Sequence, residues 1–274
     1  MRLSKRNLAV AALLAAMLAP AIALAATTAA ADRDPETKPD AEVPRWQAGV
    51  YYTYDHFTPD DVDWHEGQLY LKRRTPIGSV IGRFSHAWRY GTTDDLIEVE
   101  AYPKIRPGTY AWVSLGYSPG ADLYPRYRFG GDLYQSLPAS FEASLGYRRL
   151  GFTSPVNIYV GSLGKYVGSW LVTGRVFVTP GGAGTSNSWS IGARRYFGTA
   201  AYWGFRYGQG RSPEEIRTTS QLEVLNSRSV GGELVLPLAR RWEIDVRASY
   251  GREDRIERAD LDHASVGVGL FRAF

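Results

Sequence analysis

The sequence predicts an all-β protein, a transmembrane antiparallel up-and-down β-barrel. Three observations carry this prediction: an N-terminal segment typical of an export signal, repeated alternation of apolar with polar residues, and aromatic residues at the ends of the alternating segments. The 274 residues include 18 Tyr, 8 Trp and 29 Gly, a composition that suits many short strands joined by tight turns. A soluble β-sandwich shares this composition and alternation, so the export signal and the aromatic positions decide the prediction.

Residues 1–25 are expected to be a cleaved signal peptide. A basic start leads into an apolar run, and Ala23 and Ala25 fit the small-residue pattern of a cleavage site. An uncleaved membrane anchor is the alternative, because the apolar run approaches the ~20 residues that span a bilayer. Pro20, the high Ala content and the cleavage site favour a signal peptide.

Two further regions follow the signal peptide. Residues 26–44 are rich in Ala, Thr, Asp and Pro and are expected to form a disordered periplasmic leader. Residues 45–274 are expected to form the barrel. No segment in them approaches ~20 consecutive apolar residues, which excludes helical spans and leaves a closed barrel as the way to cross a membrane.

Charge and cysteine content exclude several functions. The formal net charge is +4, but without Arg2, Lys5 and Arg6 of the signal peptide 29 of the 32 basic residues remain against 28 acidic ones. A mature chain so close to neutrality has no electrostatic footprint for nucleic acid. The absence of cysteine excludes disulfides, thiolate metal sites and cysteine nucleophiles.

The alternation of apolar and polar residues is clearest from Trp242 to Tyr250. Even positions are apolar and end in an aromatic residue on both sides, whereas odd positions are Glu, Asp, Arg and Ser. A transmembrane strand has this pattern because one face meets lipid, the other meets a polar lumen, and aromatic residues mark the interfaces. Less complete alternation occurs in residues 97–101, 141–148, 170–178 and 201–207.

The expected turns fall into two groups, which fits short periplasmic turns and longer outer loops. Tight turns are expected at residues 75–78, 105–108, 136–138 and 239–241, and looser or more charged ones at residues 58–63, 180–186, 208–219 and 252–262. They divide the chain into about 14 strands, with 12 or 16 as alternatives. This count treats residues 218–239 as one strand that contains Gly231 and Gly232.

The last segment, residues 264–274, ends in Phe274 and places Val266, Val268 and Leu270 on the same face. Such a strand resembles the signal that the barrel assembly machinery reads. Arg272 departs from this pattern, where an apolar or aromatic residue is usual, but an arginine at the interface can extend its charged end into water.

The stretch Tyr124–Pro138, with its sequence YPRYRFGGDLYQSLP, resembles the core of the YaiO family of outer-membrane proteins. The resemblance continues through residues 142–152 and covers nearly all of the mature chain, with further similar pieces at residues 52–57, 166–170 and 207–215. It implies a barrel in the outer membrane of a Gram-negative cell. Similar domains occur beside machinery for exopolysaccharide export, and the resemblance implies no catalytic residues.

A lipid-hydrolase function needs a serine and a histidine on one face that opens toward lipid. His263 and Ser265 have a suitable spacing, but they lie opposite the apolar set of their strand, so they are expected to point into the lumen or an outer loop. Ser85 and His86 are adjacent and should point to opposite faces. We therefore expect no enzymatic activity.

Metal binding is not indicated either. The histidines are scattered, at positions 56, 65, 86 and 263, and the first loop, with Asp60, Asp61 and Asp63, lacks the glycine and glutamate of a calcium loop. A solvated loop is the expectation, and no cofactor is expected.

Charged residues on the polar faces are the candidate functional feature. The candidate conduit residues are Arg126, Arg128, Arg148, Arg175, Arg206, Arg247, Glu98, Glu100, Glu243 and Asp245, and Arg83, Arg89, Arg194, Asp132, Glu142 and Glu223 fall on the same faces. They fit either a network of ion pairs that fills a narrow lumen, or a conduit for anionic or polyhydroxylated solutes. In the conduit, inward aromatic residues such as Tyr110, Trp112 and Tyr202 would add contacts.

Three functions follow in order of preference. The first is a non-enzymatic barrel for envelope or exopolysaccharide transport, as an accessory to an export system. The second is a non-conducting structural or surface-receptor barrel, and the third is a lipid-modifying enzyme. Expected partners are outer-membrane lipid and lipopolysaccharide, the barrel assembly machinery, and exopolysaccharide or its export system.

Overall fold

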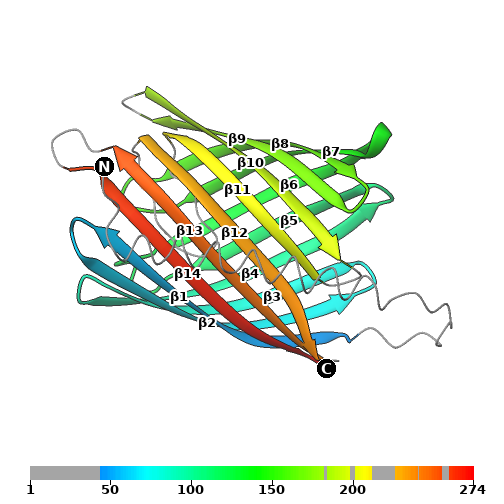
Figure 1. The fold of residues 1–274 in the computed structure, drawn as a ribbon, viewed down its shortest axis with the longest axis horizontal. Helices are drawn as coiled ribbons and strands as arrows, with labels where there is room; N and C mark the ends of the chain where they lie inside the picture. Colours follow the sequence, from blue (N-terminus) through cyan, green and yellow to red (C-terminus); the bar gives the residue numbers. More distant parts are fainter. Residues whose placement is uncertain (1–43, 182–183, 198–200, 212–225, 240, 255–258) are drawn as a thin grey trace.

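The computed structural model is a closed barrel of fourteen antiparallel strands (Figure 1). The structure describes residues 44–181, 184–197, 201–211, 226–239, 241–254 and 259–274. The predicted signal peptide, nearly all of the predicted leader, and Glu223 lie outside these residues. The predicted fold class and the strand number are confirmed.

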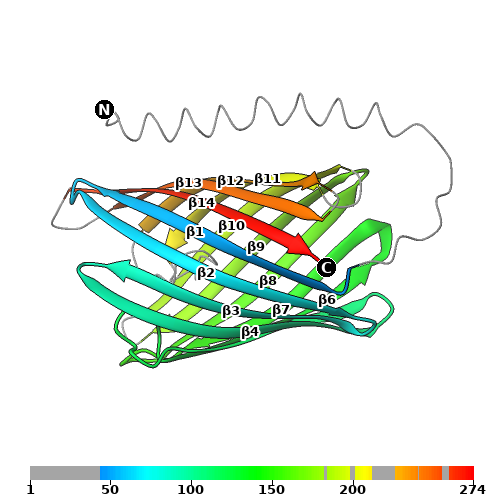
Figure 2. The ribbon, with the colours of Figure 1, turned by 90° about the horizontal axis from the view of Figure 1, so that it is seen from below.

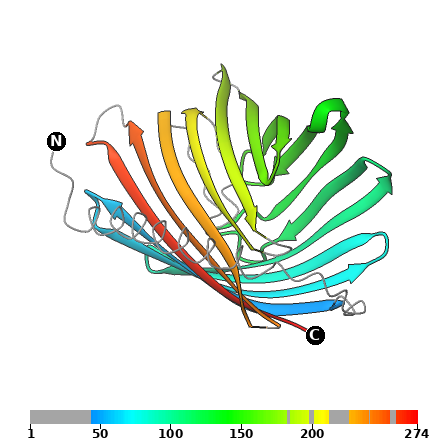
Figure 3. The ribbon, with the colours of Figure 1, turned by 45° about the vertical axis from the view of Figure 1, so that its right-hand side comes forward.

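Each strand pairs with its neighbours in the chain, so that the strands follow one another around the barrel in chain order (Figure 3). The strands are β1 (Trp46–Thr58), β2 (Val62–Thr75), β3 (Gly78–Arg89), β4 (Thr92–Arg106), β5 (Thr109–Tyr117), β6 (Tyr127–Leu137), β7 (Phe141–Leu150), β8 (Val156–Val167), β9 (Trp170–Gly181), β10 (Gly184–Phe197), β11 (Ala201–Arg211), β12 (Asn226–Ala239), β13 (Trp242–Asp254) and β14 (Leu261–Ala273), and a short 3-10 helix, η1 (Pro138–Ser140), joins β6 to β7.

The first and last strands close the barrel (Figure 2). Trp46 and Phe274 exchange backbone hydrogen bonds of 3.0 and 2.9 Å, which places both ends of the barrel segment at one rim. We call this rim the terminal end and the opposite rim the loop end. Every pair of strands is antiparallel, and because all neighbours except β1 and β14 are consecutive in the chain, the described strands contain no crossover connection.

The expected turns separate between the two rims as predicted. The four tight turns all lie at the terminal end, and the four looser ones all lie at the loop end. Two of the loop-end turns are shorter than expected. β1 ends at Thr58 and β2 already begins at Val62, and β9 and β10 pair as far as Gly181 and Gly184. Within residues 218–239, β12 runs through both glycines without a break, and residues 218–225 lie outside the described part.

Side-chain exposure is inverted relative to that of a water-soluble protein. Apolar side chains on the outer face are exposed, as for Leu145 at 77%, whereas carboxylates on the inner face are buried, as for Asp132 at 2%. Because a continuous apolar outer face around a charged interior is unfavourable in water and favourable in lipid, this inversion rules out the soluble sandwich.

An aromatic girdle marks the terminal end of the outer face. Several of its rings lie under an outward basic side chain: Arg73 over Trp46, Lys165 over Phe141, Arg195 over Trp170, and Arg272 over Trp242. Arg272, the residue that departs from the assembly signal, thus rests 5.6 Å from the centre of an interfacial tryptophan ring.

No helix in the described residues is long and apolar enough to cross a membrane.

Candidate functional site: the lumen

The inner surface of the barrel divides into two walls of different composition. The paired wall is the inner face of β2 to β7, where large charged and aromatic side chains alternate. The arginine wall is the inner face of β8 to β11, where small residues and arginines predominate. This difference in composition determines which groups each side of the lumen presents to a solute.

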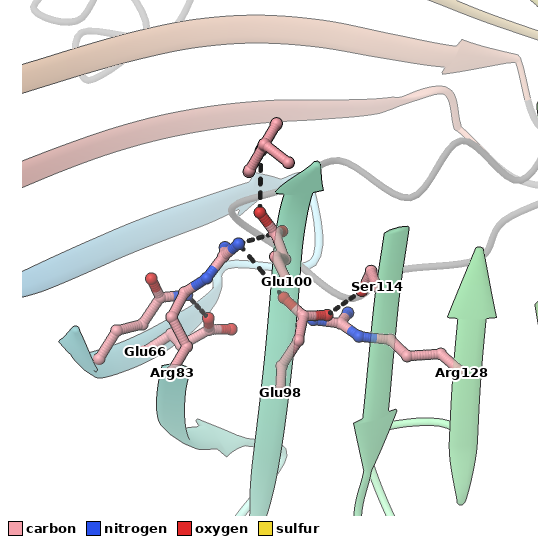
Figure 4. A network of polar contacts seen from close by, with 8 residues as sticks. Glu66, Arg83, Glu98, Glu100, Ser114 and Arg128 are labelled. Carbon is pink, nitrogen blue, oxygen red and sulfur yellow. Dashed lines mark hydrogen bonds and ion pairs between the residues drawn. The ribbon is translucent and has the colours of Figure 1, made fainter. Parts of the chain in front are cut away.

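Glu98 is the centre of the paired wall (Figure 4). It forms ion pairs with Arg83 on β3 at 3.3 Å and with Arg128 on β6 at 2.5 Å. Ser114 donates a further hydrogen bond to Glu98 at 3.2 Å, and Arg83 also pairs with Glu100. The four charged side chains are 4–15% exposed. Buried charges persist only when they are paired and hydrogen-bonded, so this cluster is structural.

Two more arginines of this wall are held in the same way. Arg148 on β7 lies 3.5 Å from Asp132 and over the ring of Trp112, and its side chain is 7% exposed. Arg89 on β3 pairs with Glu66 at 3.2 Å and is 4% exposed. Arg148 was predicted as a conduit residue, but its burial leaves little of its guanidinium for a solute.

The loop between β5 and β6, residues 118–126, is folded against this wall at the loop end. Asp94 on β4 holds it: the carboxylate accepts hydrogen bonds from the Ser118 hydroxyl at 2.8 Å and from the backbone N–H groups of Asp122, Leu123 and Tyr124 at 2.9–3.0 Å. Tyr124 is 1% exposed and packs against Ala87 and Leu96. Burial raises the pKa of its phenol, which therefore stays neutral.

This loop corrects one predicted residue. Arg126 was expected on the inner face of a strand, but β6 begins only at Tyr127, and Arg126 is an exposed residue of the loop. Its backbone N–H donates to Gly151 at 3.0 Å, which ties the loop to the end of β7. The N–H of Ser118 also donates to the Arg126 carbonyl at 3.1 Å, so strand-like hydrogen bonding reaches Arg126 although β6 begins one residue later.

The arginine wall presents its charges differently. Arg175, Arg194 and Arg206 lie on the same face as a row of small residues, namely Ser162, Gly164, Thr173, Ser190, Gly192, Gly204 and Gly208. The Arg194 side chain is 34% exposed even though it pairs with Glu233 of β12 at 2.6 Å, and Arg206 is exposed. Inward and exposed side chains border space that water can enter.

A simple sequence signal marks the arginine wall. No aspartate or glutamate occurs between Glu142 and Glu214, so that β8 to β11 contain no acidic residue at all. Arg194 finds its carboxylate only on β12, and Arg175 donates instead to the Tyr134 hydroxyl at 3.3 Å, across to β6. The acid-free run is visible in the sequence, and it distinguishes these arginines from those that have a carboxylate on a neighbouring strand.

Three further predicted conduit residues lie on β13, beyond the arginine wall. Arg247 pairs with Asp245 at 2.6 Å, with exposures of 36% and 9%, and Glu243 accepts a hydrogen bond from Gln47 of β1 at 3.3 Å. All three lie on the inner face, as expected from the alternation. Among the predicted aromatic contacts, Trp112 is 5% exposed within the paired wall, whereas Tyr202 lies under Arg194, 4.4 Å from ring centre to guanidinium.

Two histidines contact acidic residues that could not be identified from the sequence alone. His263 faces inward, as predicted, and lies 2.8 Å from Asp55 of β1. Its ring stacks on Phe57 at 4.3 Å, and Ser265 lies opposite Asp55 in the strand register. His86 faces outward beside Asp95 while Ser85 is buried inside, so these two do point apart. No cluster of three metal-ligating side chains occurs in the described ranges.

A family model described as the YaiO membrane beta barrel domain matches residues 46–215. The chain belongs to the YaiO family. The match spans β1 to β11 and includes both walls of the lumen, whereas the last three strands lie outside it. As a YaiO membrane barrel, the chain is an outer-membrane β-barrel protein.

Solved structures share the fold at low sequence identity. Omp33 of Acinetobacter baumannii is 10% identical with a TM-score of 0.50, and the alignment covers 86% of this YaiO chain and all of Omp33. An anion-selective porin from Comamonas acidovorans is also 10% identical, with a TM-score of 0.46 over 84% of this chain and 98% of the porin. No curated protein sequence matches the chain significantly. At this identity the likeness shows the fold alone.

Proposed function

We propose that this barrel is a non-enzymatic, water-filled conduit of the outer membrane for anionic, hydroxyl-rich solutes. Within the cell it would serve envelope or exopolysaccharide transport as an accessory to an export system. The observation that carries the proposal is the arginine wall: three inward arginines among small polar residues, on four strands without a single acidic residue.

The two walls differ in the net charge and in the space that they offer to a passing solute. On the paired wall each buried arginine is matched by a carboxylate, so the part of that wall around Glu98, Asp132 and Glu66 offers a passing ion little net charge. On the arginine wall glycine and serine leave room for water, and guanidinium groups point into that room. A guanidinium donates in a planar fork that suits carboxylates and phosphates, and it would favour anions along this side.

Single-channel conductance of the refolded mature chain in a planar bilayer tests the proposal. Steady openings with a reversal potential that favours anions are expected. The double variant Arg175→Gln, Arg206→Gln should lower the anion-to-cation permeability ratio, by about twofold or more. The matched control is Arg195→Gln, because Arg195 lies one residue from the arginine wall and faces the lipid interface.

A folded barrel that never opens would overturn the conduit and favour the second function, a non-conducting structural or surface-receptor barrel. The loop held by Asp94 is the observation that supports this alternative, because it covers part of the lumen at the loop end. An ion preference that the double variant leaves unchanged would also contradict the role of the arginine wall.

A lipid-modifying function has less support. His263, Asp55 and Ser265 are each at most 8% exposed and lie on the inner face. The His263 ring stacks on Phe57, in a cluster with Trp64 and Leu261. If this group were catalytic, Ser265→Ala would abolish a lipase or acyltransferase activity of the purified barrel, and we expect no such activity to lose.

A further inference from the structure

A hollow at the terminal end of the lumen lies apart from the arginine wall. It has a volume of about 510 Å³ and is formed by the inner faces of β2 to β5 where these strands reach the rim. Its lining contains three basic side chains and no carboxylate. The lining residues are Lys72, Arg74, Thr75, Gly78, Ser79, Ile81, Tyr102, Lys104 and Tyr110.

The three cations lack the carboxylates that the same wall supplies to its other arginines. Within the described part of the chain, no ion pair joins Lys72, Arg74 or Lys104 to an acidic residue, although Arg83, further along the same wall, contacts two glutamates. Glu243 of β13 accepts a hydrogen bond from Gln47 and attracts Lys72 and Arg74 from outside the lining, and Glu142 of β7 contacts Tyr110. Three cations line the hollow and no carboxylate does, so the lining itself is positively charged and attracts an anion.

The rest of the lining adds features that a bare ion would not use. Tyr110 is stacked on Tyr134 with ring centres 4.6 Å apart and planes 1° apart, which makes a stiff aromatic floor. Tyr102 is fixed by donating to Glu100 at 2.9 Å, and Thr75 and Ser79 bring hydroxyl groups. The volume is in the range of pockets for organic ligands and far exceeds that of a phosphate ion.

We infer that this hollow is a binding site for acidic sugars, in which the two lysines and Arg74 hold the carboxylate and the tyrosine rings and hydroxyls contact the sugar ring. The inference goes beyond a conduit, because binding at the rim does not require that the lumen conducts. A uronic acid fits this lining because it combines one negative charge with a hydroxylated ring.

Isothermal titration calorimetry of the refolded mature chain in zwitterionic detergent tests the site without any transport. The probes are a short oligomer of glucuronic acid, the glucose oligomer of equal length, and inorganic phosphate. The acidic oligomer should bind at least about tenfold more tightly than the neutral one, because only the former meets the cations. The variant Lys72→Gln, Lys104→Gln should weaken it about tenfold or more.

Lys165→Gln is the matched control, since Lys165 lies on the outer face over Phe141 and should leave the affinity unchanged. If the double variant does not fold, Arg74→Gln replaces it, because Arg74 is exposed at the rim. Equal binding of the two oligomers, or unchanged affinity in the rim variants, overturns the site. Phosphate that binds as tightly as the acidic oligomer overturns the sugar assignment and leaves a simple anion site. A barrel that binds the sugar but stays silent in a bilayer contradicts the conduit alone.

Discussion

The paired wall and the arginine wall use the same side chain for opposite purposes. On β2 to β7 an arginine is buried against a carboxylate, as Arg148 is against Asp132. On β9 to β11 an arginine borders open space, as Arg206 does. The difference does not lie in the arginines themselves. It lies in their neighbours, because acidic and bulky residues surround the first group, whereas glycine, serine and threonine are the neighbours of Arg175 and Arg206 in the strand register.

The largest loss of stability is expected when a carboxylate that two arginines share is removed from the paired wall. Glu98→Gln leaves both Arg83 and Arg128 with a weaker partner inside the paired wall, and should lower the free energy of unfolding by about 3–5 kcal/mol. Glu233→Gln, which removes the partner of Arg194, should cost about 1 kcal/mol or less, because water solvates that pair. Urea unfolding in detergent micelles measures both, and equal losses would show that the two walls do not differ.

An intermediate effect is expected where the paired wall holds the loop. Asp94→Ala removes the acceptor of several hydrogen bonds from residues 118–126, and should cost about 2–3 kcal/mol. The freed loop should then be cut by trypsin after Arg126 and should increase single-channel conductance. Resistance to trypsin equal to that of the parent barrel would mean that the packing of Tyr124 suffices to hold the loop.

The smallest effect concerns a contact that bridges the two walls. Arg175→Gln breaks the 3.3 Å hydrogen bond to Tyr134, a bond between partly exposed groups, and should change stability by less than about 1 kcal/mol. Thermal unfolding followed by heat-dependent gel mobility would detect a larger loss. Such a loss would place Arg175 with the structural arginines of the paired wall.

Much of the fold was accessible from the sequence because a transmembrane strand imposes a strict period. Trp242 to Tyr250 shows this: every side chain there has the face that its parity predicts. The two rims were predictable only in part: the four expected tight turns all lie at the terminal end, but β3 and β4 are also joined by a two-residue turn, at the loop end.

The contacts inside the lumen were not accessible in the same way. Parity tells that His263 points inward, but not that its partner is Asp55, which lies 208 positions away in the chain and meets it only because the barrel closes. The anchoring of the loop by Asp94 was missed for a related reason, since its donors are mostly backbone N–H groups, which leave no mark on residue type. Arg126 was misplaced by one residue, because β6 begins only at Tyr127.

Because the strands follow one another in chain order, the position of a residue in the sequence determines its angular position around the barrel. The acid-free run between Glu142 and Glu214 is therefore a single sector of the cylinder and not a scatter of points. Substitutions within one contiguous part of the sequence can change that sector, while the opposite sector keeps the ion pairs that stabilise the barrel. Hairpins exchanged between β8 and β11 would therefore carry the residues of the arginine wall with them.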